Sequence, residues 1–137
     1  MSKLGLNKAL AKFEQIKTTL PRVIANDSVG FFLKGFDKGG FTDASFKAWK
    51  PRKGKQYGRN ATRKILVDSG ALRRAVSNSV KQANWDAIKF EVELNYAAYV
   101  NNGTDKMPQR KYIGSSKKLT KQNLEKIEVV INNIWQG

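Results

Sequence analysis

The apolar positions near the start of the chain predict a long amphipathic helix. Steps of three and four place one set of them on a single helical stripe: Leu6, Leu10, Phe13, Ile16, Leu20 and Ile24. Pro21 falls within this stripe, and because proline lacks a backbone donor we expect a kink or the start of a second helix there. Apolar residues continue to Phe36, although Gly30 and Gly35 weaken the helical pattern. Gly39-Gly40 is expected to end the helical part.

Two later segments predict a small sheet and a second long helix. Polar residues separate four alternating apolar positions, as in a strand with one buried face: Ile88, Phe90, Val92 and Leu94. Its hairpin partner is expected over residues 76–80, joined through 82–86, with Trp85 covering one end. Near the end of the chain a helical stripe recurs, widened by Val130 and closed by Trp135: Leu124, Ile127, Ile131 and Ile134. This helix is expected to pack on the sheet beside the first one, and its wide stripe can also contribute to a subunit contact.

These elements predict an α+β fold, in which a small antiparallel sheet packs against long N-terminal and C-terminal helices. A long basic loop is expected over residues 37–63. The length of 137 residues fits a single domain, 1–137. No apolar run reaches the roughly 18 residues that would predict a membrane span. Charged residues interrupt any signal-peptide core near the N-terminus, so we expect the cytoplasm of the producing cell: Lys8, Lys12 and Glu14.

The segment from Phe41 to Asn60 is rich in Gly, Lys and Arg, with aromatic residues spaced through it. We interpret it as an ordered loop that its aromatic side chains hold in place, with a mobile tip near residues 54–59. Trp49 beside Pro51 favours a hydrophobic anchor for this loop. The mixture of basic and aromatic residues would alternatively suit a stacking groove for single-stranded nucleic acid. The sequence leaves the role of the charges open.

A short helix is expected through Val76, after the apolar run over residues 65–67. Asp68-Ser69 offers N-cap chemistry for this helix. Leu72 and Val76 would face inward at helical spacing, which leaves Arg73-Arg74 outside. No partner base stands near Asp68-Ser69, so we interpret the pair as a cap and not as catalytic residues.

Composition argues against several kinds of chemistry. Without cysteine there is no disulfide, thiolate nucleophile or zinc–thiolate site, and without histidine the commonest general base and metal ligand are missing. Glu91 and Glu93 share one face of the expected strand, which would suit a metal ion. No third acidic residue stands nearby, so a solvated face opposite lysines is the preferred interpretation. We predict no catalytic residue, no cofactor and no metal site.

The charge of the chain is strongly positive and uneven. Its formal net charge is +15, from 26 basic and 11 acidic residues. Ten basic residues against two acidic ones lie between Lys34 and Lys64. A field of this sign attracts polyanions and speeds encounter with acidic surfaces. Nucleic acid is one candidate partner, and a ring of acidic protein is another.

The segment from Tyr96 to Gly114 begins with an apolar and aromatic run. Residues 96–100 are expected to form a short helical turn or a bend after the strand. Asn102-Gly103 and Met107-Pro108 then break regular structure, because Gly supplies positive φ and Pro restricts the residue before it. The polar loop that results carries Arg110 and leads into Tyr112.

Four short blocks follow one another over roughly residues 30–120: Trp49-Lys50; Val67 to Arg73, with Ser69, Gly70 and Leu72; Tyr96-Ala97 with Asn101 to Gly103; and Arg110, Tyr112, Ile113, Gly114 and Ser116. In order and spacing they resemble the phage virion morphogenesis family, the tail-completion or head–tail joining proteins of tailed phages and prophages. The sequence departs from the family pattern at Ser69, where Thr is commoner, and at Lys111-Tyr112, where Pro-Phe is expected.

The resemblance implies a structural protein that acts at the head–tail junction of a virion by docking to connector, neck and tail proteins. It implies a homo-oligomeric ring in the particle, with a monomer left open for the isolated protein and a contact with phage DNA left open for the basic stretch. It implies a location in the virion after assembly in the bacterial host cytoplasm, without a membrane. The residues expected to dock are Trp49, Lys50, Arg52, Lys53, Arg73, Arg74, Tyr99, Asn102, Arg110 and Tyr112.

Two other hypotheses come from different classes of protein. Positive charge favours a free-standing nucleic-acid-binding domain, although no recognised nucleic-acid-binding motif is present. A small nuclease would need a carboxylate–metal site in the absence of His and Cys. The aspartates stand in different segments of the chain, which speaks against such a site: Asp27, Asp37, Asp43, Asp68 and Asp86.

Overall fold

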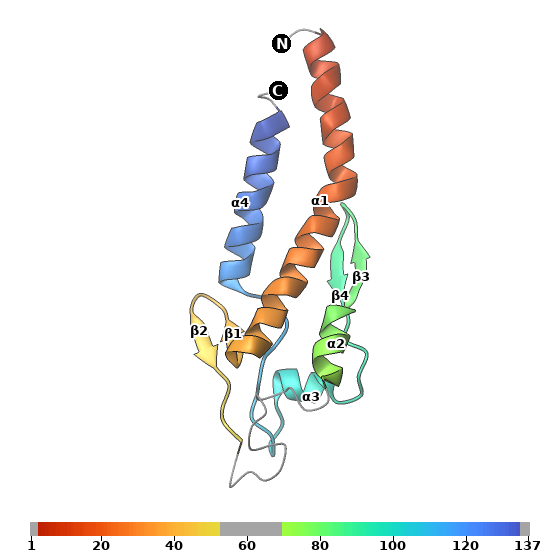
Figure 1. Cartoon of the computed structure of the whole chain (residues 1–137). Helices are drawn as coiled ribbons and strands as arrows, with labels where there is room; N and C mark the ends of the chain where they lie inside the picture. Colours follow the sequence, from red (N-terminus) through yellow and green to blue (C-terminus); the bar gives the residue numbers. More distant parts are fainter. Residues whose placement is uncertain (1–2, 53–69, 135–137) are drawn as a thin grey trace.

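The computed structural model describes residues 3–52 and 70–134. Helices α1 (Lys3–Lys38) and α4 (Lys117–Ile134) lie side by side and run in opposite directions, so the first turn of α1 and the last turn of α4 share one end of an elongated molecule (Figure 1). Two antiparallel hairpins and two short helices lie around the other half of α1 (Figure 1). The predicted α+β class, with long helices at both ends of the sequence, is confirmed. Several predictions lie outside the described residues: Lys53, the loop tip at 54–59, the run at 65–67, the Asp68-Ser69 cap and Trp135.

Helix α1 continues without a break through Pro21 and through both of its glycines. Pro21 lies inside the helix, and Figure 1 shows that the axis of α1 changes direction partway along its length. Proline cannot donate the backbone hydrogen bond of its turn, which permits a bend at that point. The predicted kink is therefore present, and no second helix begins there. Most of the buried residues of α1 follow the bend.

Two glycines determine how α1 ends. Gly39 adopts a left-handed conformation with φ of 77°, and its N–H donates to the carbonyl of Gly35 over 2.8 Å. Gly35 also lies against the chain that follows, since a Cβ at that position would stand 2.6 Å from the carbonyl oxygen of Gly40. The helix end predicted at Gly39-Gly40 is confirmed.

The chain then forms a small hairpin in which β1 (Gly40–Thr42) pairs with β2 (Phe46–Ala48). Phe41 packs in the core, whereas the β2 side chains are exposed. The backbone N–H of Trp49 donates to the carbonyl of Gly39 over 2.9 Å, which ties the exit of β2 to the end of α1. The described part of residues 37–63 therefore differs from the continuous loop expected there.

Helix α2 (Ala71–Ser77) follows Gly70, whose φ of 78° turns the chain into the helix without a side-chain cap. Leu72 and Val76 are buried, as their spacing predicts. Strands β3 (Val80–Ala83) and β4 (Ile88–Phe90) then form the second hairpin.

The second hairpin corrects the predicted strand pairing. The partner of the strand at residue 88 is 80–83 and not 76–80, because residues 71–77 are helical. Strand β4 ends at Phe90, although the N–H of Glu91 still donates to the carbonyl of Ser79 over 2.7 Å. Val92 and Leu94 then pack partly against the core. Trp85 at the turn is 47% exposed and places its ring edge-on to Phe13 of α1, with 5.7 Å between centroids.

Residues 97–102 form helix α3 (Ala97–Asn102), in agreement with the predicted helical turn. In α4 the predicted stripe is only partly buried: Ile134 is covered, but Leu124 and Ile131 are 60% and 37% exposed. Among the described elements, α1 is the main neighbour of α4. One edge of the wide apolar stripe of α4 therefore stays in solvent. Periodicity identified the residues on this side of the helix but not the neighbour that covers them.

The core lies around the second half of α1 and joins all parts of the described chain. Its fully or nearly buried members come from α1, β1, the exit of β2, α2, α3, the loop after α3 and α4: Phe32, Phe36, Phe41, Trp49, Leu72, Val76, Ala97, Val100, Tyr112 and Leu119. Among the described residues, no helix combines the length and the hydropathy needed to cross a membrane.

Candidate functional site

The exposed end of the molecule opposite the first turn of α1 is built from two distant segments. Helix α3 and the loop after it meet the chain where it leaves β2 (Figure 1). Five predicted docking residues lie on these segments and are exposed or half-buried: Lys50, Arg52, Tyr99, Asn102 and Arg110. We refer to the exposed side chains of these two segments as the distal surface. Arg110 is hydrogen-bonded to Lys50 within it, and Asn102 also lines a hollow described below.

Trp49 holds the first of these segments in place. Its ring is 7% exposed and stands edge-on to Phe36, with 5.6 Å between ring centroids. Its indole Nε1 donates to the carbonyl oxygen of Lys111 over 2.7 Å. The anchoring role predicted for Trp49 is confirmed, whereas the prediction that it docks directly is corrected, because a buried ring offers no surface to a partner.

Tyr112 holds the second segment from inside the core. It is 2% exposed, and its hydroxyl donates to the carbonyl oxygen of Ala97 over 2.9 Å. Burial, and to a smaller extent the ionisable Tyr96, raises the pKa of Tyr112 to about 12. Tyr112 therefore supports the distal surface and does not belong to it, which corrects the prediction that it docks.

Asn101 belongs to the third motif block, but its role in supporting the loop was not predicted. Its Oδ1 accepts backbone N–H groups from Tyr112 at 2.9 Å and from Ile113 at 3.2 Å. One side-chain amide thus satisfies two donors of a loop that forms no ladder. The sequence signal was its place directly before Asn102-Gly103, where a turn was expected.

Arg110 joins the two segments across a separation of about sixty residues. Its Nε donates to the carbonyl of Lys50 over 3.0 Å and its Nη2 to the carbonyl of Pro51 over 3.3 Å. Its backbone N–H donates to the carbonyl of Val100 over 3.0 Å. Partial burial, and then the charge of Arg52, lowers the pKa of Arg110 from its usual value. The guanidinium therefore fixes the loop and also presents positive charge at the distal surface.

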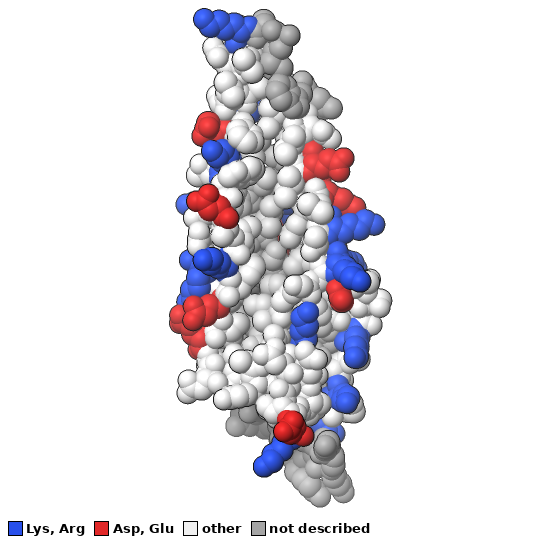
Figure 2. All heavy atoms as spheres, turned by 180° about the vertical axis from the view of Figure 1, so that it is seen from behind, with Lys and Arg blue, Asp and Glu red and all other residues white. Residues whose placement is uncertain are grey.

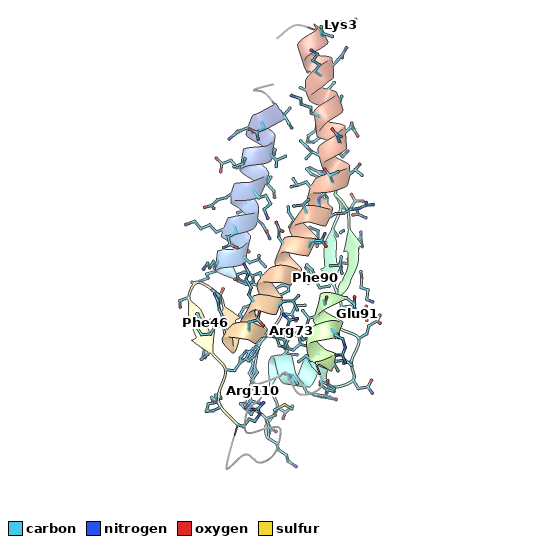
Figure 3. All side chains as sticks on the ribbon, viewed as in Figure 1. Lys3, Phe46, Arg73, Phe90, Glu91 and Arg110 are labelled. Atoms are coloured by element: carbon cyan, nitrogen blue, oxygen red, sulfur yellow. The ribbon has the colours of Figure 1, made fainter. Side chains whose placement is uncertain are left out.

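Arg73 and Arg74 lie elsewhere. Figure 3 shows Arg73 on α2 and Arg110 on the loop at the distal end. The Arg73 guanidinium is 3.6 Å from the carboxylate of Asp37 on α1, so it pairs within the molecule. Arg74 is exposed near the start of α2, beside Gly70. The structure thus does not bring these two predicted docking residues onto the distal surface.

The last block of the sequence pattern connects the first hairpin to α4. The buried Ser116 hydroxyl donates to the carbonyl of Thr42 over 2.6 Å and accepts the N–H of Leu119 over 3.2 Å. The Asp43 carboxylate accepts the N–H of Lys117 over 2.8 Å, at the first turn of α4. These bonds satisfy free donors at the helix start. Asp43 therefore acts as a structural cap.

Acidic side chains are dispersed over the described surface. Glu91 and Glu93 are exposed, and the Glu93 carboxylate pairs with the ammonium of Lys81 at 2.5 Å. This pair matches the solvated arrangement opposite lysine that the sequence favoured. Within residues 3–52 and 70–134, no three acidic side chains gather closely enough to hold a metal ion.

A largely apolar hollow of about 580 Å³ lies between α1, β4 and α4. Its lining includes the apolar side chains of Phe32, Ile88 and Phe90 and the polar side chains of Ser28 and Asn123. Asn123 Nδ2 donates to the Ser28 hydroxyl over 3.4 Å, and its buried Oδ1 has no partner among the described residues. Figure 2 shows uncharged residues along the middle of one face of the molecule, between two rows in which basic and acidic residues are mixed.

The chain matches no family model, no curated protein and no solved structure. The resemblance to the phage family, which depends on four short blocks, therefore stays a prediction. What the geometry adds is the arrangement of those blocks. Trp49 of the first block and Arg110 of the last are each hydrogen-bonded to the backbone of the other segment.

Proposed function

We propose that this protein is a structural component of a phage or prophage particle that acts at the head–tail junction. It completes the tail or joins it to the head by docking on connector and tail ring proteins. The observation that carries the proposal is that the first and last motif blocks, far apart in sequence, support one exposed surface. Trp49 Nε1 bonds to the Lys111 carbonyl, and Arg110 Nε bonds to the Lys50 carbonyl.

On this proposal the protein works by binding and not by turnover. The buried rings of Trp49 and Tyr112 give the distal surface a fixed shape before the partner arrives. A surface that is ordered in advance loses less conformational entropy on docking. Tyr99, 58% exposed, and the cations of Lys50 and Arg52 would then make the direct contacts.

We further propose that the protein forms a homo-oligomeric ring in the particle and is located in the virion after assembly in the host cytoplasm. A stable ring contact requires about 1,000 Å² or more of complementary surface. The exposed edge of the α4 stripe, at Leu124 and Ile131, supports a subunit contact there. The isolated protein is expected to be a monomer at modest concentration, because a net charge of +15 makes copies of the chain repel one another.

The test is particle assembly with variants of the distal surface in the phage or prophage that encodes the protein. Tyr99→Ala removes an exposed ring, and Arg110→Glu reverses the charge beside Arg52. Both variants are expected to keep the wild-type helical signal in circular dichroism and to lose infectious yield. Lys8→Glu, which makes the same charge change on an exposed residue of α1, is the control. Wild-type yields from folded Tyr99→Ala and Arg110→Glu proteins would contradict docking through this surface.

A nucleic-acid-binding domain is the second candidate, and the net charge of +15 favours it. Binding through phosphates weakens log-linearly as salt rises. Titration with duplex DNA at two salt concentrations separates the candidates. Micromolar or tighter binding at physiological salt would favour this second function, and undetectable binding would favour assembly by protein contacts.

A further inference from the structure

A second hollow, of about 400 Å³, lies between the second half of α1, the first half of α4 and strand β1. Four lysines line it: Lys34, Lys38, Lys118 and Lys126. Lys34 and Lys38 stand one turn apart on α1, where side chains share a face. The other two come from α4, which crosses beside this part of α1 (Figure 1). Two distant helices thus bring four lysines to one concave site, which we call the lysine pocket.

The positive charge of the lysine pocket is poorly balanced. Asp27 is the acidic residue among those that line it, and its carboxylate pairs with Lys126. Asp37 lies on the same helix as Lys34 and Lys38 but pairs with Arg73 of α2. Among the described residues, Lys34, Lys38 and Lys118 pair with no carboxylate. These three cations therefore have too few anionic groups around them within the described chain, and an added carboxylate would interact favourably with them.

We propose that the lysine pocket binds the carboxylates of an acidic peptide segment on a partner protein. This inference rests on the proposed docking function and names the chemistry of one partner surface. A hollow of about 400 Å³ can receive one or two side chains, and the amide of Gln122 adds a hydrogen-bond donor beside the lysines. Carboxylates accept charge-assisted hydrogen bonds from ammonium groups.

The aromatic residues of the pocket favour a peptide over single-stranded nucleic acid. Base stacking requires an open ring face. Phe41 is buried, with the Phe32 ring stacked on it at 6.5 Å between centroids and the Lys111 ammonium 4.8 Å from its centre. Phe31 places its ring edge-on to both Phe32 and Phe41, at 6.1 and 6.3 Å between centroids. The packed Phe41 ring therefore offers no open face on which a base could stack.

The experiment titrates fluorescein-labelled hexaglutamate into the purified full-length protein and follows fluorescence anisotropy. A Lys34→Gln, Lys118→Gln double variant removes two pocket cations that have no carboxylate partner. The control double variant, Lys8→Gln with Lys89→Gln, lowers the net charge equally at exposed lysines outside the pocket. Removing two charge-assisted contacts is expected to weaken binding by about tenfold or more, while the control stays within about twofold of wild type.

Amide shifts in a ¹H–¹⁵N spectrum of the wild-type protein supply a second readout that needs no variant. Hexaglutamate is expected to shift residues 26–42 and 118–126 more than the rest of the chain. Equal weakening by both double variants, or shifts spread over the whole surface, would overturn the proposal. Binding of a short oligothymidylate at these residues more tightly than hexaglutamate would also overturn it. The titration measures peptide binding and not particle assembly. Failure of the peptide-binding proposal can therefore be distinguished from failure of the proposed assembly function.

Discussion

Replacing Trp49 with alanine tests the support of the distal surface. The substitution removes a ring that is 7% exposed, its edge-on contact with Phe36 at 5.6 Å, and the hydrogen bond from Nε1 to the Lys111 carbonyl. Because Trp49 connects the exit of β2 to the loop that carries Arg110, the loss is expected to loosen both segments. The long helices α1 and α4 do not depend on this contact for their hydrogen bonds.

The expected destabilisation follows from these contacts. Truncation of a buried tryptophan to alanine costs about 3–5 kcal/mol of unfolding free energy. Within that loss the hydrogen bond contributes about 1 kcal/mol, and the ring pair contributes about 0.5–1.5 kcal/mol beyond area burial. For a domain of this size the total corresponds to a fall in melting temperature of roughly 10–20 °C.

Thermal and urea unfolding, followed by far-UV circular dichroism, measures this loss. Trp85→Ala is the matched control, because Trp85 is 47% exposed and its ring makes an edge-on contact with Phe13. This control is expected to lose about 1 kcal/mol or less. Trp49→Phe keeps most of the ring and should fall between the two. A Trp49→Ala protein that melts at the wild-type temperature would refute the proposed support.

Three further predictions concern single contacts. Gly35→Ala is expected to destabilise by about 1–3 kcal/mol in urea, because its Cβ would stand 2.6 Å from the Gly40 carbonyl oxygen. Gly30→Ala in the same helix meets nothing within 4 Å and should stabilise by up to about 1 kcal/mol; equal effects would contradict the close approach. Asn101→Ala leaves two backbone donors unpaired and should lose about 1–3 kcal/mol, whereas a wild-type urea midpoint would show that its amide is dispensable. Burial raises the pKa of Tyr112 from 10.0 to about 12, so the protonated hydroxyl stabilises the folded protein fully below pH 10. This stabilisation is lost as pH rises toward 12. Tyr112→Phe should lose less stability over that interval, and equal losses would contradict the shift.

The sequence predicted the elements whose signal is local. The period of apolar residues identified both long helices, and Gly39-Gly40 marked the end of the first. The first hairpin was not predicted, because its strands have three residues each and its pairing depends on contacts between residues distant in the chain. Gly40, for example, lies where a Cβ would stand 2.6 Å from the ring of Phe46.

The distal surface was predicted in part. Pro51 beside Trp49 indicated an anchored loop, and the anchor is present. The exposed position of Tyr99 and the buried position of Tyr112 could not be separated, because both are aromatic residues in a short mixed segment. The bonds of Arg110 to the backbone at Lys50 depend on a tertiary approach that no local pattern encodes.

Deletion of the gene from the genome that encodes it, followed by electron microscopy of any phage particles released on induction, tests the proposed role in joining heads to tails. If the protein joins heads to tails, unjoined heads and tails will accumulate in the deletion strain, and the wild-type gene supplied in trans will restore joined particles. Intact, infectious particles at wild-type number in the deletion strain would contradict it.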